Sequence, residues 1–407
     1  MTSKVNNFHK SLIINTLETS VFAELSKTRK NFILSVLCLF LSIKGRINFL
    51  QLSRYSDFCE QSFRIHFENL FDFSRFNSEI IKRYCSLERI VAIDPSYISK
   101  SGKQSYGLSR FWSGCAKSCK WGLEICGFAV VDAVQHTAFH LRAIQTPALE
   151  KGANLLDYYG CLIKENYLHF KEFSDYLVAD AYFSKAPFLE SVLACGMHFI
   201  SRLRDDANMQ YLYCGEQDGK KGRNKKYDGK VNAKKPNPKY FVLLQDQEDV
   251  KIYSAKVWSV AFKREINLAL VIFFKDGKEI ARKLYFSTDL ELEAVKLVSY
   301  YRSRFQIEFL YRDAKQHTGL NDSQARSKNK LDFHFNASLT AVNLAKAHWV
   351  SICTEQKIPF SMDDYKRMEF NRLMLQTFFR VFAINPNLPK NKLKVKELLR
   401  FGVKNTA

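Results

Sequence analysis

The sequence lacks the spaced cysteines of a zinc site and any apolar segment long enough for a membrane helix. Its ten cysteines include no CxxC pair, so free thiols in a reducing compartment are favoured over a zinc site at Cys115, Cys119 and Cys126. The longest apolar run, Phe32 to Ile43, is far short of the roughly 20 residues that span a bilayer. The polar first ten residues show no secretory signal. We therefore expect a cytoplasmic protein without a membrane partner.

Acidic residues are also scarce relative to basic ones. The 407 residues contain 62 Lys and Arg against 41 Asp and Glu, which gives a formal net charge of +21. Basic side chains on phosphates release counterions, so a polyanionic partner explains the excess. A basic but inert surface and attraction to anionic membranes are the alternatives. Nucleic acid is the favoured interpretation, and the length indicates two to four domains or sub-domains.

The amino-terminal part, residues 1–85, has the three-to-four spacing of apolar residues that is typical of helices. Within it, Ile47 to Phe67 predicts two short helices around Tyr55-Ser56-Asp57. This pattern suggests a helix-turn-helix with Gln61, Ser62 and Arg64 on its second helix, in a position to contact DNA. A plain helical hairpin that packs on the rest of the protein is an equally good interpretation.

After residue 85 the pattern changes to strands that later alternate with helices. Such an order fits a mixed sheet covered by helices, an α/β fold. The expected strands are Arg89 to Ile93, Leu123 to Val134, Thr137 to Ile144, Tyr176 to Ala179 and His198 to Leu203, with helices over Ala148 to Glu165 and from Ala181 to about Cys195.

The stretch from Gly215 to Tyr240 interrupts this order. Between Lys220 and Lys239 it has nine Lys or Arg and one Asp, a composition that cannot build a core. Such a run is usually a solvated loop, but in a basic protein contact with DNA backbone is at least as good an interpretation. The candidate DNA contacts here are Lys220, Lys221, Arg223, Lys225 and Lys226.

Four apolar segments between Tyr240 and Ser287 then predict a β-rich insertion with a turn at Asp276-Gly277. From Glu291 to about Thr318 the sequence predicts one long helix, and helices are expected from there to the end.

Two of the predicted strands deliver an aspartate at their carboxyl ends. Asp94 follows RIVAI, and Pro95 is expected to end that strand; Asp180 follows YLVA. Each alone suits a cap or a turn. Together with Glu308 on the late helix they suggest a metal site, because clustered carboxylates stay ionised only around a cation. Oxygen ligands select Mg²⁺ or Mn²⁺, and two such ions activate a nucleophile and stabilise a leaving oxygen in phosphodiester chemistry.

The predicted late helix places cations beside Glu308. At about 100 degrees per residue, Tyr301, Arg304, Glu308 and Lys315 fall on one stripe, which Arg312 joins. Ion pairs four residues apart support any exposed helix, so the stripe alone favours a structural role. The aspartates at the strand ends favour a functional one.

The spacing Y-x2-R-x3-E-x6-K of Tyr301, Arg304, Glu308 and Lys315 resembles the signature of DDE transposases of bacterial insertion sequences, in particular the insertion sequence four family. The contexts IDPS at Asp94 and VADAYFS at Asp180, and the segment YGLSRFWSG (residues 106–114), add to the resemblance, which covers roughly residues 30–350.

The resemblance implies an RNase H-like core that is interrupted by a β-rich insertion and flanked by helical regions. It divides the chain into a DNA-binding domain at 1–85, the first part of the core at 86–204, the basic loop and insertion at 205–288, the last core helices at 289–350, and a C-terminal helical region at 351–407. It also implies a bacterial, nucleoid-associated location.

The resemblance assigns roles to residues as well. Asp94, Asp180 and Glu308 are implied as catalytic metal ligands, and Tyr301, Arg304 and Lys315 as phosphate contacts; Arg312 lies beside them. Some relatives stack a flipped base on a tryptophan of the insertion, which makes Trp258 a weak candidate, although a core tryptophan is the favoured interpretation.

The implied activity is cut-and-paste transposition of an insertion sequence by a homodimer in a DNA synapse, acting on terminal inverted repeats and target DNA through a hairpin intermediate. Two alternatives remain open: a transposase-derived DNA-binding repressor, and a nuclease of the same fold that cuts without joining.

Overall fold

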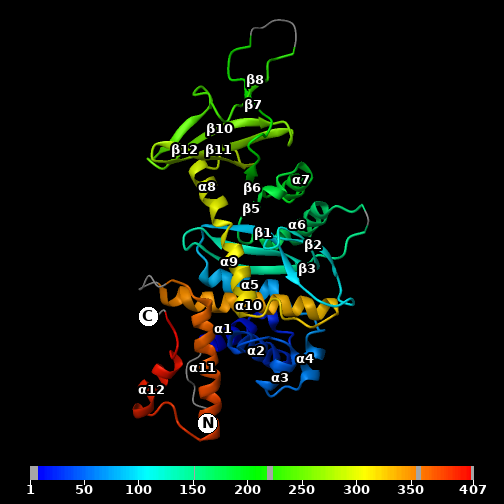
Figure 1. Ribbon diagram of the computed structural model, residues 1–407, viewed down its shortest axis with the longest axis vertical. Coiled ribbons are helices and arrows are strands. Elements are labelled where there is room, and N and C mark those ends of the chain that lie inside the picture. The colour runs from blue at the N-terminus through cyan, green and yellow to red at the C-terminus, as the bar shows by residue number, and fades with distance from the viewer. Residues whose placement is uncertain (1–7, 151, 218–222, 354–358, 405–407) are drawn as a thin grey trace.

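The computed structural model describes residues 8–150, 152–217, 223–353 and 359–404. The protein is elongated (Figure 1). A β-rich end carries β7 and β8, a central sheet with its helices lies in the middle, and a helical end contains both termini. This α/β architecture, with helices in the N- and C-terminal regions of the chain, agrees with the sequence-based expectation.

The central part of the sheet has the order β4-β3-β1-β5-β6. β3 runs antiparallel to both β1 and β4, whereas β1, β5 and β6 run parallel to one another. Such an order agrees with the RNase H-like core that the sequence led us to expect. The bounds are β1 Arg89–Ser99, β3 Ser118–Asp132, β4 Thr137–Gln145, β5 Tyr176–Val178 and β6 His198–Leu203, and β2 (Ser109–Ser113) pairs with the first part of β3.

One expectation about β1 was wrong, because the strand does not end at Asp94. It continues through Pro95, opposite Cys126 of β3, as far as Ser99. Pairing with β5 has already stopped at Ala92, so Pro95 stands where the strand has a neighbour on one side only. A residue without an amide hydrogen is tolerated at such a position. Asp94 therefore lies in the middle of a long strand, beyond the end of its parallel neighbour.

The β-rich insertion extends the same sheet. β12 pairs antiparallel with β6, and the strand order then continues β12-β11-β10-β7-β8, with β9 on β10. All twelve strands of this path and its branches thus belong to one sheet. The bounds are β7 Met209–Leu212, β8 Tyr227–Lys230, β9 Val242–Asp246, β10 Val250–Ser259, β11 Arg264–Lys275 and β12 Lys278–Ser287.

Helices on the core follow the sequence pattern with two differences. α6 (Leu155–Lys171) begins later than expected, at an Asn154 side chain that accepts a hydrogen bond from the amide of Leu156. The expected single helix from Glu291 is two helices, α8 (Ala294–Ser303) and α9 (Gln306–His317), separated at Arg304 and Phe305. Both separating residues keep right-handed helical dihedrals, so the break is one tightened turn. The remaining elements here are the 3-10 turn η2 (Ala181–Phe183) and α7 (Ala186–Ala194).

The helical end is joined to the core by α10, which crosses beneath the central sheet and contacts β4, α2 and α5 (Figure 1). Rings of Phe32, Phe63, Phe67 and Phe333 pack together at this junction, with Phe67 and Phe333 centroids 4.3 Å apart. The bounds are α1 Phe8–Leu17, η1 Ser20–Phe22, α2 Lys27–Ser42, α3 Phe49–Arg54, α4 Glu60–His66, α5 Phe73–Tyr84, α10 Lys328–Cys353, α11 Met362–Val381 and α12 Pro389–Leu399. None of the helices in the described part of the chain is both long enough and apolar enough to cross a membrane.

Candidate active site

Asp94 is held from its backbone side by a residue that the sequence did not single out. The hydroxyl of Tyr311, on α9, donates a 2.5 Å hydrogen bond to the carbonyl oxygen of Asp94. Tyr311 reaches that carbonyl across Gly127, the residue of β3 that pairs with Asp94. A β-carbon at position 127 would overlap the Tyr311 hydroxyl. Gly127 and Tyr311 therefore fix the distance between α9 and the strand that carries Asp94.

Asp180 follows the short parallel strand next to β1. Its side-chain Oδ1 accepts a hydrogen bond of 2.9 Å from the amide of Tyr182, and thereby caps the turn η2. Its carbonyl oxygen accepts 2.8 Å from the Ser201 hydroxyl on β6. Because β1 and β5 run parallel, both aspartates stand beyond the same edge of the core strands.

The guanidinium of Arg304 lies among the three predicted carboxylates. Its Nη2 is 3.0 Å from Oε1 of Glu308, and its Nη1 is 3.7 Å from Oδ1 of Asp94. Only 11% of the Arg304 side chain is exposed, and its Nε and Nη1 make no hydrogen bond. Burial lowers the pKa of Arg304, but the combined interactions with Asp94, Tyr301, Glu308 and Asp180 outweigh it and raise that pKa. Asp94 and Glu308 therefore pair with one buried cation, and Asp180 acts on it electrostatically.

The electrostatics of Asp94 show how closely the acids are coupled. Burial raises the pKa of Asp94 to about 7. Arg304 and Lys315 oppose that rise, whereas the like charges of Asp180 and Glu308 add to it. A further cation placed beside Asp94 would stabilise its ionised form and lower its pKa. The cluster therefore has the chemistry of a cation site.

Three hard carboxylate oxygens are the donor set that a Mg²⁺ or Mn²⁺ ion prefers. In the described residues, however, no three side chains of His, Cys, Asp or Glu stand close enough together to hold an ion as they are placed. Arg304 supplies the physical reason, since its guanidinium stands between Asp94 and Glu308. The three side chains are of the type that binds a divalent ion, and in the structure Arg304 balances the charges of Asp94 and Glu308.

The other residues of the predicted stripe have separate positions. Tyr301 packs its ring 4.7 Å from that of Tyr285 on β12, and burial raises its pKa. Lys315 donates 2.9 Å hydrogen bonds to the Ser96 hydroxyl and the Tyr97 carbonyl. Lys315 thus fastens α9 to β1 two residues beyond Asp94, a contact that the sequence did not suggest.

Arg312 lies outside the cluster. Its side chain is 53% exposed, pairs with Asp313 at 3.0 Å and lies over the Phe309 ring. In sequence it belonged to the stripe, but the structure pairs it with its own helix and not with the predicted carboxylates.

The candidate DNA contacts of the helical end are away from this cluster. α3 and α4 form the two short helices expected around Tyr55, at the opposite side of α10 from the core sheet (Figure 1). Gln61 and Arg64 are exposed and Ser62 is partly exposed, with Arg64 paired to Glu60. Their exposure is compatible with either interpretation of this segment.

The candidates of the insertion lie at the other end. Arg223, Lys225 and Lys226 are exposed beside β8, and Lys220 and Lys221 lie outside the described residues. Trp258 is half-buried on β10, and its ring lies 5.5 Å from that of Tyr227. It is therefore a partly covered surface residue, not a core tryptophan.

The fold and the candidate site together define an α/β protein with a mixed sheet, in which a buried arginine pairs with acids from a central strand and an adjoining helix. Comparison with known proteins gives the family. Residues 88–344 match the family described as "Transposase DDE domain", and this chain belongs to that family. DDE transposase domains generally use divalent metal ions.

Two further comparisons give less. No curated protein matches the chain. Among solved structures, the chain is similar to a piggyBac transposase synaptic complex with hairpin DNA, solved by cryo-electron microscopy. That likeness has a TM-score of 0.43 and 12% identity, and covers 98% of this chain and 83% of the other.

Proposed function

We propose that this protein is a transposase of the insertion sequence four family that moves its element by cutting and pasting DNA. Asp94, Asp180 and Glu308 are its catalytic carboxylates and hold two divalent ions, Mg²⁺ or Mn²⁺. The observation that carries the proposal is the gathering of these three acids around the buried Arg304 guanidinium, within a chain whose family is the DDE transposases.

The proposed reaction is phosphodiester cleavage followed by joining. When bound, the ions supply a lowered pKa for the attacking hydroxyl group and charge compensation for the leaving oxygen. Arg304 moves from the carboxylates to a phosphate oxygen of the element end, which it contacts with two parallel hydrogen bonds. Tyr301 and Lys315 lie on either side of this position along α8 and α9 and hold the same strand. A hairpin at the element end and transfer to target DNA follow.

The proposed assembly is a homodimer that brings two element ends together. Residues 1–85 recognise the terminal repeats, with Gln61, Ser62 and Arg64 on α4 as the contacting residues. The basic segment with Arg223, Lys225 and Lys226 holds DNA through its phosphates. The net charge of +21 supports a polyanionic partner of this extent.

The test replaces each carboxylate without removing DNA-binding surface. Asp94→Ala, Asp180→Ala and Glu308→Gln are expected to abolish metal-dependent cleavage of a labelled element end while leaving its binding largely intact. Glu291→Gln is the matched control, because Glu291 is 84% exposed and pairs with Lys256, outside the cluster. Normal cleavage by any of the three variants removes that residue from the proposed site.

The same experiment separates the alternatives. A repressor would bind the element end but show no cleavage even in the wild-type protein with Mn²⁺. A nuclease would cleave the end but give no strand-transfer product with a pre-cleaved end and plasmid target. Titration of the metal-free protein with Mn²⁺ by calorimetry reports on the ions independently of activity, and Asp94→Ala is expected to lose most of the binding heat.

A further inference from the structure

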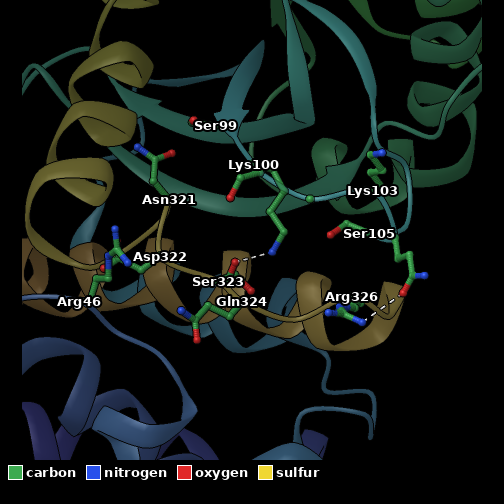
Figure 2. A pocket seen from close by; sticks show the side chains of 13 residues that line it. Arg46, Ser99, Lys100, Lys103, Ser105, Asn321, Asp322, Ser323, Gln324 and Arg326 are labelled. Carbon is green, nitrogen blue, oxygen red and sulfur yellow. Dashed lines mark hydrogen bonds between the residues drawn. The ribbon is translucent and has the colours of Figure 1, made fainter.

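A basic groove begins next to the carboxylate cluster and leads to the helical end of the protein. Its wider part is a cavity of about 740 Å³ between the loop that follows β1, the loop between α9 and α10, and the turn after α2 (Figure 2). A second cavity of about 360 Å³ shares Arg46 and Asp322 with it and includes Lys315. The two cavities are thus neighbours that share a wall, and together they are called the groove; Lys315 ties the narrower one to β1 near Asp94.

The charges that line the groove are almost all positive. The wider cavity has Arg46, Lys100, Lys103 and Arg326 against a single acid, Asp322. The narrower one adds Lys44, Lys315 and Arg367, of which Arg367 is paired with the further acid Asp363 at 3.0 Å, and the buried Lys366. A concave surface lined by one sign of charge concentrates ligands of the opposite sign. The chemistry of the groove thus selects an extended polyanion.

Some charged side chains of the groove form hydrogen bonds to backbone groups of the protein. The cations that form none of these bonds are the ones available to a ligand. Asp322 accepts a 2.9 Å hydrogen bond from the amide of Ile47 and so ties the helical end to the core. Lys100 donates to the carbonyl oxygens of Ser323 and Ala325, at 2.6 and 2.9 Å. These bonds shape the wall of the groove and leave its positive charge uncompensated.

Three exposed cations remain on that wall. Arg46 and Lys103 form no ion pair in the described part of the chain, and Arg326 donates only to the neutral side chain of Gln104 (Figure 2). They come from three different segments of the chain and line different parts of the same cavity, so they could contact successive phosphates of one strand.

The distance from the groove to the reacting bond follows from the position of Asp94 on β1. Within β1, five residues separate Asp94 from the last residue, Ser99, which lines the wider cavity. Five residues of strand span about 17 Å, which corresponds to about five nucleotides at the roughly 3.4 Å per step of a duplex strand.

We propose that this groove binds the sugar–phosphate backbone of a DNA strand about five nucleotides from the phosphodiester that reacts at the carboxylate cluster. The inference rests on the proposed function and goes beyond it by assigning a binding site to Arg46, Lys103 and Arg326. These side chains contact phosphates and not base edges, so the contact is independent of sequence.

The first test measures how DNA binding depends on salt. The triple variant Arg46→Ala, Lys103→Ala, Arg326→Ala is compared with the wild-type protein on a 30-base-pair duplex of random sequence. Each lost phosphate contact lowers the slope of log affinity against log salt by about 0.9, so the slope is expected to fall by between 2 and 3. The control variant Lys164→Ala, Lys275→Ala, Lys278→Ala removes the same charge from exposed positions outside the groove and is expected to change the slope far less. Equal slopes for the two triple variants overturn the proposal.

The second test finds the contacted phosphates and the source of the DNA. Uncharged methylphosphonates are placed singly at two to eight nucleotides on either side of the cleavage position of an element-end duplex, and in a target duplex joined to a pre-cleaved end. A substitution near the fifth nucleotide is expected to weaken binding by the wild-type protein and not by the groove variant. An effect on the end duplex assigns the groove to DNA at the element end, and one on the target duplex assigns it to target DNA; no position-specific effect on either overturns it. If the wild-type protein neither binds nor cleaves DNA, the proposed function fails, whereas a normal wild-type protein with an indifferent groove variant refutes the groove alone.

Discussion

Replacing Arg304 should separate catalysis from stability, because the residue lies at the centre of the carboxylate cluster but holds little of the folding free energy at neutral pH. Arg304→Ala removes a guanidinium that is 3.7 Å from Asp94 and 3.0 Å from Glu308. A bare Coulomb estimate for the first pair is about 4 kcal/mol at an effective dielectric constant of 20. The folding free energy that is lost is much smaller, because Asp94 takes up a proton when Arg304 is absent and then carries no unpaired charge.

The free energy that this protonation costs at pH 7 follows from the pKa of Asp94, which burial raises to about 7. At pH 7 the ionised form of Asp94 contributes only RT ln 2, about 0.4 kcal/mol, relative to a carboxyl that stays neutral. The i,i+4 pair with Glu308, whose own side chain is 40% exposed, contributes about a few tenths of a kcal/mol more. We therefore expect Arg304→Ala to lower the free energy of unfolding of the metal-free protein by about 1 kcal/mol at pH 7.

The pH dependence gives the same reasoning a sharper form. The raised pKa means that the contribution of Asp94 to stability is complete below its unfolded pKa of 3.8 and is lost as the pH rises through about 7. Without Arg304 the pKa of Asp94 rises further, so the loss continues above pH 7. The deficit of Arg304→Ala relative to wild type should then grow by up to about 1.4 kcal/mol per pH unit between pH 7 and 9. In an Asp94→Asn background this growth should vanish.

Activity is expected to respond on another scale. Misplacing the reacting strand costs on the order of a hundredfold in rate, and Arg304→Lys should not restore it, because a lysine cannot form the two parallel hydrogen bonds of a guanidinium. The assays are urea unfolding in chelator from pH 6 to 9 and metal-dependent cleavage of a labelled element end. Arg302→Ala, at an exposed residue in the last turn of α8 next to Arg304, is the control. Near-wild-type cleavage by Arg304→Ala would refute the proposed phosphate contact, and a deficit independent of pH would refute the coupling to Asp94.

Four other outcomes are expected. Gly127→Ala should lower the free energy of unfolding by about 1–3 kcal/mol through the collision with Tyr311, and a thermal melt unchanged from wild type would contradict the close approach. Tyr311→Phe should cost about 1 kcal/mol for the lost bond to the strand carbonyl, read from urea unfolding. Burial lowers the pKa of Lys366 to about 7, so the unfolded state alone binds its proton between pH 7 and 10.5; stability from this residue should rise with pH by up to about 5 kcal/mol across that window, and Lys366→Met should flatten the rise in unfolding measured from pH 6.5 to 10. Gln61→Ala combined with Arg64→Ala should abolish the preference for element ends over random DNA in competition binding, and intact discrimination would support the hairpin interpretation of this segment.

The amino-terminal test uses substitutions because of how the helical end packs. Phe32 of α2 lies against Phe333 of α10, and Asn77 of α5 is hydrogen-bonded to Leu141 of β4. Removing residues 1–85 would expose these apolar surfaces of α10 and of the core. A truncated chain would therefore report on lost folding as well as on lost recognition.

The core elements were predictable where one face or both faces of a strand are apolar throughout. Thr137 and His198, the first residues of β4 and β6, were placed correctly because apolar runs begin there. β1 begins at Arg89 as expected, but the prediction that it ends before Pro95 was wrong. At Pro95 the strand pairs with β3 alone, so the missing amide hydrogen does not interrupt the pairing. Which side of a strand is paired depends on the partner strands, and the local sequence does not contain that information.

The three carboxylates were proposed from their positions along the chain, and that proposal did not include the residues around them. Arg304 and Glu308 were expected on one helix, whereas the chain makes a tightened turn between α8 and α9 that leaves them facing one another. Tyr311 had no signal in the sequence, because its role depends on a carbonyl 217 positions away and on the absence of a side chain at Gly127. The contact of Lys315 with Ser96 is of the same kind, with 219 positions between the partners.

The pairing of β6 with β12 has a consequence for any attempt to dissect the protein. The insertion covers the outer edge of β6, where the residues from Ile200 to Leu203 lie opposite Leu284 to Ser287. Cutting the insertion out would leave those peptide groups of β6 without partners, and an open, apolar sheet edge recruits other chains. The insertion therefore also covers the edge of the core sheet, and a shortened protein without it would be expected to self-associate through β6. Trimming should instead begin beyond β10, at the β7–β8 end, where pairing to the core sheet is no longer at stake.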